Sequence, residues 1–237
     1  MVGPRARIGV VGPNGVGKST LLKVLAGLEP LDAGRVTLAP PSASVGYLAQ
    51  EPEVNPGETL FSSLARRTGV TAAEAELEGT ADGLAAGGAG AEEAYSSALE
   101  RYLSLGGPDL AARAGAVCDD LGLPADRLDV EVDVLSGGQQ ARASLAAVLL
   151  SRFDVLLLDE PTNDLDFAGL ARLERFVDQT EAGLVIVSHD RVFLERTIDR
   201  VVELDEHSHR ATEYGGGWLA YLDGRATARH QAEEAHD

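Results

Sequence analysis

The chain has 237 residues, of which 44% are hydrophobic and 24% are charged. This composition is typical of a folded globular protein with a sizeable core, and it excludes disordered, fibrous and disulfide-stapled classes. With 20 basic and 38 acidic residues the formal net charge is −18, which disfavours contact with phosphate backbones and anionic lipid. No apolar run reaches the ~20 residues of a membrane span, and the start lacks an apolar signal region. We therefore expect no membrane segment. Since the single cysteine, Cys118, cannot form an internal disulfide, we also expect a cytoplasmic protein.

Hydrophobic patterning predicts an α/β fold when the elements are taken in chain order. Residues 7–11 predict a strand, a helix follows the glycine-rich turn after it, and residues 35–38 and 45–48 predict two short strands. Residues 58–134 carry no strand signal and predict a helical subdomain. Strands and helices then alternate at 155–160, 167–179, 184–190, 191–197 and 201–205. Short apolar strands separated by helices predict a parallel sheet that is covered on both faces.

Residues 12–19, with the sequence GPNGVGKS, fit the pattern G-x-x-x-x-G-K-[ST] of a phosphate-binding loop. Glycines let backbone N–H groups turn toward a phosphate, and the helix that opens at Lys18 adds its N-terminal dipole. Lys18 is expected to reach the β- and γ-phosphates, and the Ser19 hydroxyl to hold Mg²⁺. A plain glycine turn is the alternative, but a strand before it and a helix after it favour the phosphate loop. The residues predicted to bind ATP are Gly12, Asn14, Gly15, Gly17, Lys18, Ser19 and Thr20.

The strand VLLLDE at 155–160 ends in two carboxylates, at the edge where open α/β sheets bind ligands. Asp159 suits the Mg²⁺ shell, and Glu160 is placed to orient or deprotonate a water that attacks the γ-phosphate. The alternative is a strand that ends in two solvated acids, which the upstream phosphate loop disfavours.

The segment Leu135–Gln139, with the sequence LSGGQ, resembles the signature motif of ATP-binding-cassette (ABC) ATPases, and the other motifs follow in that family's order. The resemblance implies that Gln50 senses the metal and the attacking water, that His189 contacts the γ-phosphate, and that Asp166 lies in a loop at the dimer seam. The expected catalytic residues are therefore Glu160, His189 and Gln50. The expected metal ligands are Ser19, Gln50 and Asp159, with ATP and Mg²⁺ as cofactors. The expected signature residues, which act across a dimer, are Ser136, Gly137, Gly138 and Gln139. Ser136 is also placed to cap the helix that follows it.

Three further motifs, at 161–166, 188–194 and 214–221, resemble those of the ABC-F proteins. These are tandem ATPases without membrane domains, and many of them act on the ribosome in translation or antibiotic resistance. The resemblance implies an ATP hydrolase that corresponds to a first cassette and the start of the linker after it. It implies two partners: a second ABC cassette, in a homodimer or in a missing half, and the ribosome for the full-length protein.

The expected fold is an α/β P-loop NTPase core with a mostly parallel sheet and an inserted helical subdomain. The predicted domains are the ATPase core at 1–57 and 135–210, the helical subdomain at 58–134, and the C-terminal motif with the start of a linker helix at 211–237. Eleven residues precede Gly12 and none is aromatic, so the residue that stacks on adenine in relatives has no counterpart there. We therefore expect a cassette that is shortened at both ends.

Two other functions remain open from the sequence. One is the ATP-binding subunit of a membrane transporter, against which the motif at 214–221 argues. The other is a non-catalytic fragment that lacks strands needed for folding. Cys118 lies on an apolar-periodic segment and is expected to be a core residue rather than a nucleophile.

Overall fold

The computed structural model of the chain describes residues 1–49, 55–206, 208 and 210–234. The chain divides into two compact units. The first comprises Met1–Gln50, Asp154–Asn163 and Glu174–Asp237, and the second comprises Glu51–Phe153 and Asp164–Leu173. Each unit is described by itself. The domain bounds expected from the sequence, at 57, 134 and 210, stay a prediction.

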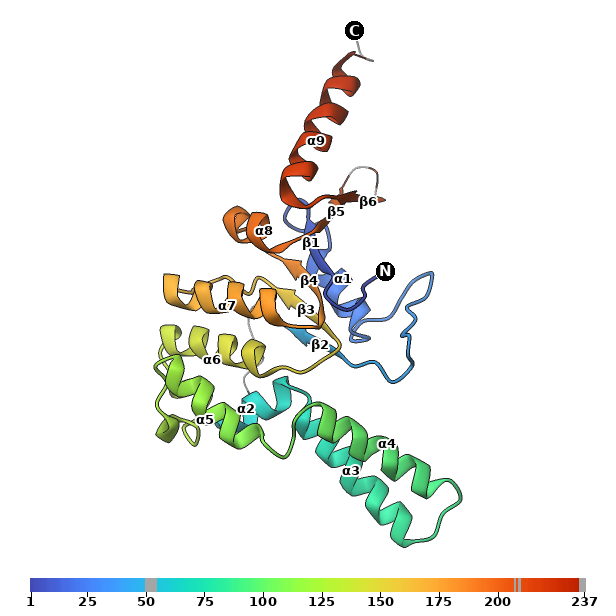
Figure 1. The fold of residues 1–237 in the computed structure, drawn as a ribbon, viewed down its shortest axis with the longest axis vertical. Coiled ribbons are helices and arrows are strands. Elements are labelled where there is room, and N and C mark those ends of the chain that lie inside the picture. Colours follow the sequence, from blue (N-terminus) through green and yellow to red (C-terminus); the bar gives the residue numbers. More distant parts are fainter. Residues whose placement is uncertain (50–54, 207, 209, 235–237) are drawn as a thin grey trace. The chain divides into compact units, whose positions relative to one another are not determined.

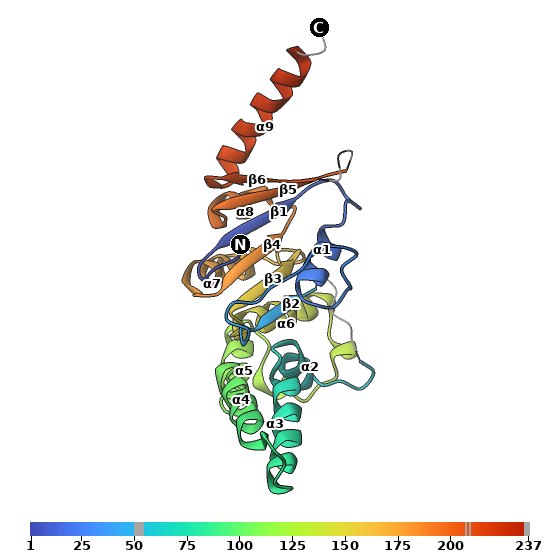
Figure 2. The same ribbon diagram turned by 90° about the vertical axis from the view of Figure 1, so that its right-hand side faces the viewer.

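The first unit contains one six-stranded sheet (Figures 1 and 2). Its strands are β1 (Arg7–Val11), β2 (Val45–Leu48), β3 (Val155–Asp159), β4 (Gly183–Val187), β5 (Arg200–Asp205) and β6 (Arg210–Gly215). The strand order is β2-β3-β4-β1-β5-β6. All neighbouring strands pair in parallel except β5 and β6, which are antiparallel. The mostly parallel sheet of the predicted α/β fold is therefore confirmed.

Helices cover both faces of this sheet. The helices of the first unit are α1 (Lys18–Leu25), α8 (Arg191–Thr197), α9 (Gly217–Glu234) and the second half of α7 (Phe167–Gln179). On one face Leu22 of α1 is fully buried against Val10, Leu157 and neighbouring valines. On the other face a Cβ added to Gly9 would lie 2.7 Å from Ile198 Cδ1, so the glycine lets the end of α8 approach β1 closely.

The buried guanidinium of Arg7 fixes the start of the strand that leads to the glycine loop. Its Nε donates to the Val177 carbonyl at 2.7 Å, and its two terminal nitrogens donate to the carbonyls of Ala182 and Thr180. Arg7 is 8% exposed, and burial lowers its pKa from the usual value. An arginine that satisfies several buried carbonyls at once holds β1 in place against the end of α7 and the segment after it.

The second unit is helical, as the sequence predicts for 58–134. Its helices are α2 (Leu60–Arg67), α3 (Val70–Ala85), α4 (Ala91–Ser104), α5 (Leu110–Asp120), α6 (Gly137–Leu150), the first half of α7, and two short 3₁₀ turns at Ala125–Arg127 and Val132–Val134. Helices α3 and α4 lie side by side as a hairpin (Figures 1 and 2).

Cys118 of α5 is fully buried, and burial raises the pKa of its thiol to about 11, which confirms it as a core residue. In the described part of the chain, no helix combines the length and apolar character that a membrane crossing requires.

Two local predictions about strands are wrong. Residues 35–38 are not a strand, since they pair with no neighbour among the described residues, and the side chains of Val36 and Leu38 are 42% and 39% exposed. Strand β6 was not predicted, because the segment Arg210–Gly215 is polar and mostly exposed. It is an edge strand whose backbone pairing with β5, rather than any apolar pattern, makes it a strand.

A half-buried carboxylate on β5 holds the first half of α9. Glu203 accepts hydrogen bonds from the hydroxyls of Tyr214 and Tyr221, at 3.3 and 3.0 Å, and its Oε1 lies 3.4 Å from Arg225 Nε. The Tyr214 and Tyr221 rings meet edge to face at 5.2 Å, and the Trp218 ring lies 5.2 Å from that of Tyr221. Burial, followed by the Glu203 carboxylate, raises the pKa of both tyrosines, so both keep their protons and donate. These aromatic residues pack α9 on the sheet.

Candidate functional site

The register of the sheet brings three strand ends to the same edge. Val187 of β4 is paired with Val10 of β1 on one side and with Asp159 of β3 on the other. Because the three strands are parallel, the segments that follow them leave from this edge together. These segments are the glycine loop after β1, the Glu160 turn after β3 and the His189 turn after β4. The first unit alone therefore assembles most of the predicted site.

The glycine loop needs its glycines for two different reasons. A Cβ on Gly12 would lie 2.6 Å from the Leu204 carbonyl oxygen, so only glycine lets the chain leave β1 so close to β5. Gly17 has φ +103° and immediately precedes α1, where its carbonyl accepts from the Leu21 N–H at 2.8 Å. The start of α1 carries no side-chain cap, so its first N–H groups stay available to an anion.

Lys18 lies over the loop, while the small polar side chains beside it face outward. Its Nζ donates to the carbonyls of Gly12 and Pro13, at 3.0 Å each, which places the ammonium charge within the loop. Ser19 and Thr20 in the first turn of α1 are exposed, as is Asn14 in the loop. The hydroxyls and the positive charge are thus at the open end of the loop, where a bound phosphate would need them.

Glu160 is buried, and the His189 turn holds it from two directions. Its Oε2 accepts from the backbone N–H of His189 at 3.1 Å, and its Oε1 lies 3.2 Å from His189 Nε2. Glu160 is 7% exposed, whereas the His189 side chain is 63% exposed. The backbone of Glu160 has φ +50°, a left-handed conformation that is uncommon outside glycine and is often found at active sites. The Glu160 carboxylate and the His189 imidazole therefore form a contacting pair in which the carboxylate is buried and the imidazole is open to solvent.

Asp159 is buried, and its two carboxylate oxygens have different environments. It is 4% exposed, and its Oδ2 accepts from the Tyr47 hydroxyl at 3.0 Å. Its Oδ1 is buried with no hydrogen-bond partner among the described residues. Burial, followed by the charge of Asp159, raises the pKa of Tyr47, so its hydroxyl stays protonated and donates. Burying a carboxylate oxygen without a hydrogen-bond donor costs free energy, and a bound cation would compensate for that cost.

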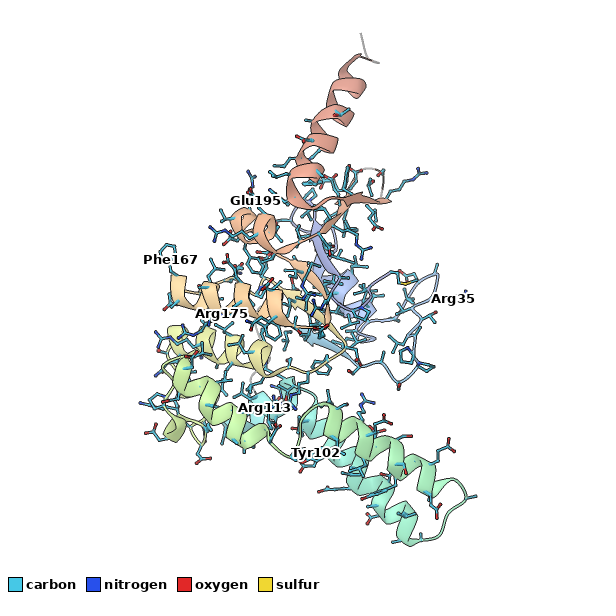
Figure 3. All side chains as sticks on the ribbon, viewed as in Figure 1. Arg35, Tyr102, Arg113, Phe167, Arg175 and Glu195 are labelled. Atoms are coloured by element: carbon cyan, nitrogen blue, oxygen red, sulfur yellow. The ribbon has the colours of Figure 1, made fainter. Side chains whose placement is uncertain are left out.

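The signature residues and Asp166 belong to the second unit. Ser136 caps α6: its Oγ accepts from the Gln139 N–H at 3.4 Å, and the Gln139 side chain accepts from the Ser136 N–H at 3.0 Å. This reciprocal pair confirms the predicted helix cap, with the helix beginning at Gly137. Ser136, Gly137 and Gly138 are exposed. Asp166 accepts from the Gly169 N–H at 2.7 Å at the start of α7, next to Phe167, which is 94% exposed (Figure 3).

The predicted site residues thus fall into three groups. The structure brings the glycine loop, Lys18, Asp159, Glu160 and His189 to one edge of the sheet in the first unit. The signature and Asp166 lie in the second unit, and Gln50 lies outside the described residues. Tyr47 was not singled out by the sequence analysis. The signal that could have found it is an aromatic hydroxyl on a strand that ends beside the acidic strand, but the order of strands is not readable from the sequence.

Comparisons with known proteins agree with this geometry. A family model described as ABC transporter matches residues 2–163, which include the glycine loop, the signature and the acidic strand. The tylosin resistance ATP-binding protein TlrC of Streptomyces fradiae is 38% identical over 100% of this chain and 44% of its own length. The energy-dependent translational throttle protein EttA of Escherichia coli K12 is 36% identical over 98% of this chain and 42% of its own length. The chain therefore spans less than half the length of these curated relatives.

A solved structure supports the fold independently. A bacterial ABC transporter cassette, described as a dimeric structure, superposes with a TM-score of 0.61 at 19% identity, over 87% of this chain and 84% of that one. At this identity the likeness shows the fold alone. The relatives confirm the resemblance to ABC-F proteins, and the family match shows that the chain belongs to the ABC transporter family of ATP-binding domains.

Proposed function

We propose that this chain binds Mg-ATP at the glycine loop and hydrolyses it to ADP and phosphate. The observation that carries the proposal is the buried Glu160 carboxylate in contact with the exposed His189, at the sheet edge where the glycine loop also begins. A buried carboxylate beside a phosphate loop is suited to general-base catalysis. Phosphate release by the purified chain in Mg-ATP tests the proposal, and its absence at every protein concentration would contradict it.

Each residue has one role in the proposed reaction. The N–H groups of the loop and the Lys18 ammonium bind the phosphates and oppose the negative charge of the transition state. Glu160 orients a water and takes its proton as the water oxygen bonds to the γ-phosphorus. The bond from that phosphorus to the ADP oxygen breaks, and ADP leaves with the electron pair. His189 holds Glu160 through its backbone N–H, and its exposed imidazole is placed to donate to the γ-phosphate.

The residues present fit a magnesium ion. The buried Asp159 Oδ1 has no donor among the described residues, and the Ser19 hydroxyl lies in the first turn of the loop helix. A carboxylate, a hydroxyl and phosphate oxygens form the oxygen donor set that Mg²⁺ prefers. Asp159 and Ser19 would hold the ion, together with Gln50. When bound, Mg²⁺ neutralises charge on the β- and γ-phosphates.

Hydrolysis is expected to need two cassettes. The chain carries one phosphate loop and one signature, and in ABC enzymes each nucleotide lies between the loop of one cassette and the signature of another. The rate per molecule should therefore rise with protein concentration until dimers predominate. Phosphate release measured across a wide dilution series, with sedimentation at the same concentrations, checks this. A rate per molecule that stays flat while the protein remains monomeric would contradict the two-cassette requirement.

We further propose that the full-length protein acts on the ribosome, in translation or antibiotic resistance, and so works in the cytoplasm. The support is the similarity to a tylosin resistance protein and to a translational throttle protein. The chain itself has a net charge of −18, and ribosomal RNA is a polyanion that repels it. Arg225, halfway along α9, is engaged with Glu203, so its charge is already partly compensated. The linker beyond α9 is the expected contact region.

The chain alone is accordingly expected not to bind ribosomes tightly. Sedimentation of the purified Glu160→Gln chain with ribosomes at physiological salt, with and without ATP, is the measurement. Most of the protein should remain in the supernatant. Stable co-sedimentation would place the contact surface on the cassette itself and overturn the assignment to the linker.

A further inference from the structure

We propose that Tyr47 is a positioning residue for the metal side of the site: its hydroxyl fixes the Asp159 carboxylate so that Oδ1 is presented to Mg-ATP. The proposal rests on the function proposed above, in which Asp159 helps to bind the metal. It adds to the site a residue of the strand that leads directly into the segment containing Gln50. Tyr47 would act through Asp159 and would not touch the nucleotide.

The register of the sheet explains how the hydroxyl reaches the carboxylate. Tyr47 of β2 pairs with Leu157 of β3, so the two side chains share a face of the sheet. Asp159 stands two residues beyond Leu157 and therefore points to that same face. It is the face that α1 covers, since Leu22 packs there against Leu157. Tyr47, Asp159 and the loop helix are thus on one side of the sheet.

The packing of the Tyr47 ring directs its hydroxyl to one partner among the described residues, Asp159. The ring is partly buried against the same apolar cluster as Leu157, which fixes its direction along the strand. The hydroxyl then donates to Asp159 Oδ2 at 3.0 Å. A carboxylate is planar, so a hydrogen bond that holds one oxygen also sets the direction of the other. The oxygen left over is Oδ1, which is buried and has no partner in the described parts of the chain.

This division of the two oxygens is what a metal-binding carboxylate needs. A carboxylate free to rotate would spread its two oxygens over several directions and would lose that freedom when the metal binds. The hydrogen bond removes this freedom beforehand, which is how a donor bonded to a metal-binding carboxylate orients it and raises metal affinity. Loss of such a donor typically lowers metal affinity by roughly 10- to 100-fold.

The hydroxyl can be removed while the ring is kept. Tyr47→Phe leaves the apolar packing and deletes only the donor. Nucleotide affinity is measured with a fluorescent ATP analogue, once in Mg²⁺ and once in EDTA, and the ratio of the two affinities reports the contribution of the metal. We expect the affinity in EDTA to stay within about twofold of the parent and the Mg²⁺ enhancement to fall at least tenfold, as when other donors to metal-binding side chains are removed. The Mg²⁺ concentration that gives half-maximal hydrolysis should rise in parallel.

Two control variants keep the result interpretable. Tyr214→Phe removes a tyrosine hydroxyl that donates to the carboxylate of Glu203 on β5, away from the metal, and should leave the Mg²⁺ enhancement unchanged. Asp159→Asn should abolish most of the enhancement, and adding Tyr47→Phe to it should have no further effect, because the hydroxyl acts through the carboxylate. The double variant therefore separates the positioning of Asp159 from any other action of the Tyr47 hydroxyl.

Each outcome bears on one of the two proposals. If Asp159→Asn leaves the Mg²⁺ enhancement intact, the proposed metal role of Asp159 fails. If Asp159→Asn removes the enhancement but Tyr47→Phe does not change it, the metal role stands and the positioning role of Tyr47 is wrong. If Tyr47→Phe lowers the affinities in Mg²⁺ and EDTA equally, or lowers the melting temperature so far that the chain no longer folds, the hydroxyl is structural and the proposal is overturned.

Discussion

Glu160→Gln should leave ATP binding intact and lower the rate of phosphate release at saturating Mg-ATP by at least about 100-fold, the usual contribution of a positioned general base. The amide keeps the size of the side chain, and its oxygen can still accept from the His189 N–H, which Glu160 Oε2 now does at 3.1 Å. It cannot take a proton from water. The chemical step should therefore fail while the architecture of the site remains, and ATP should accumulate in a protein dimer that does not turn over.

The measurement combines steady-state phosphate release with nucleotide affinity and with size-exclusion chromatography in ATP. Glu195→Gln is the matched control, because Glu195 is an exposed glutamate on α8, beyond the His189 turn (Figure 3). It should hydrolyse ATP at the parental rate. Parental hydrolysis by Glu160→Gln would remove Glu160 from the reaction and return the role of base to another group.

Lys18→Ala should weaken nucleotide binding itself, by roughly 10- to 100-fold, as expected for the loss of one or two charge-assisted hydrogen bonds to phosphate. Lys18 Nζ contacts two carbonyls of the glycine loop at 3.0 Å, so its charge already lies within the loop. Removing the ammonium leaves the loop N–H groups to bind a triphosphate without a counter-charge. The loss should therefore be larger for ATP than for ADP, because the γ-phosphate adds negative charge.

The chain supplies its own control for this experiment. Lys23 is the only other lysine in the sequence and lies in the last turn of the same helix, α1. Lys23→Ala removes the same charge from the far end of the helix and should leave the dissociation constant unchanged within about twofold. Isothermal titration of ATP and ADP into both variants gives the comparison. Equal ATP affinities for Lys18→Ala and the parent chain would contradict the assignment of Lys18.

The parts of the site that the sequence predicts correctly are those fixed by local chain geometry. The glycine loop needs a sharp exit from β1 and an uncapped helix start. Gly12 and Gly17 indicate these two features directly in the sequence. The helix cap at Ser136 is equally local, since Ser136 and Gln139 are three residues apart. Glu160 is predictable because it ends a strand of four apolar residues. None of these features depends on knowing which strands become neighbours.

The features that the sequence does not reveal depend on long-range pairing. Tyr47 contacts a residue 112 positions away, and only the placement of β2 beside β3 brings them together. Strand β6 lacks an apolar pattern because it is an edge strand. Residues 35–38 have the composition of a strand, yet composition alone does not supply a pairing partner. In each case the physical cause is sheet order, which a single sequence does not encode locally.

The contacts of Glu203 with Tyr214, Tyr221 and Arg225, here called the clasp, also make α9 a lever arm. The hydrogen bond that Tyr221 donates to Glu203 and the contact of Glu203 with Arg225 fix the first half of the helix on β5, whose Leu204 carbonyl lies against Gly12 of the glycine loop. A helix of 18 residues is about 27 Å long at 1.5 Å per residue, and the half of α9 that follows Arg225, about 14 Å, extends beyond the clasp. By that geometry a tilt of about 10° at the clasp moves the end of α9 by about 2 to 3 Å. Displacements too small to alter the nucleotide site would thus be multiplied at the end of α9.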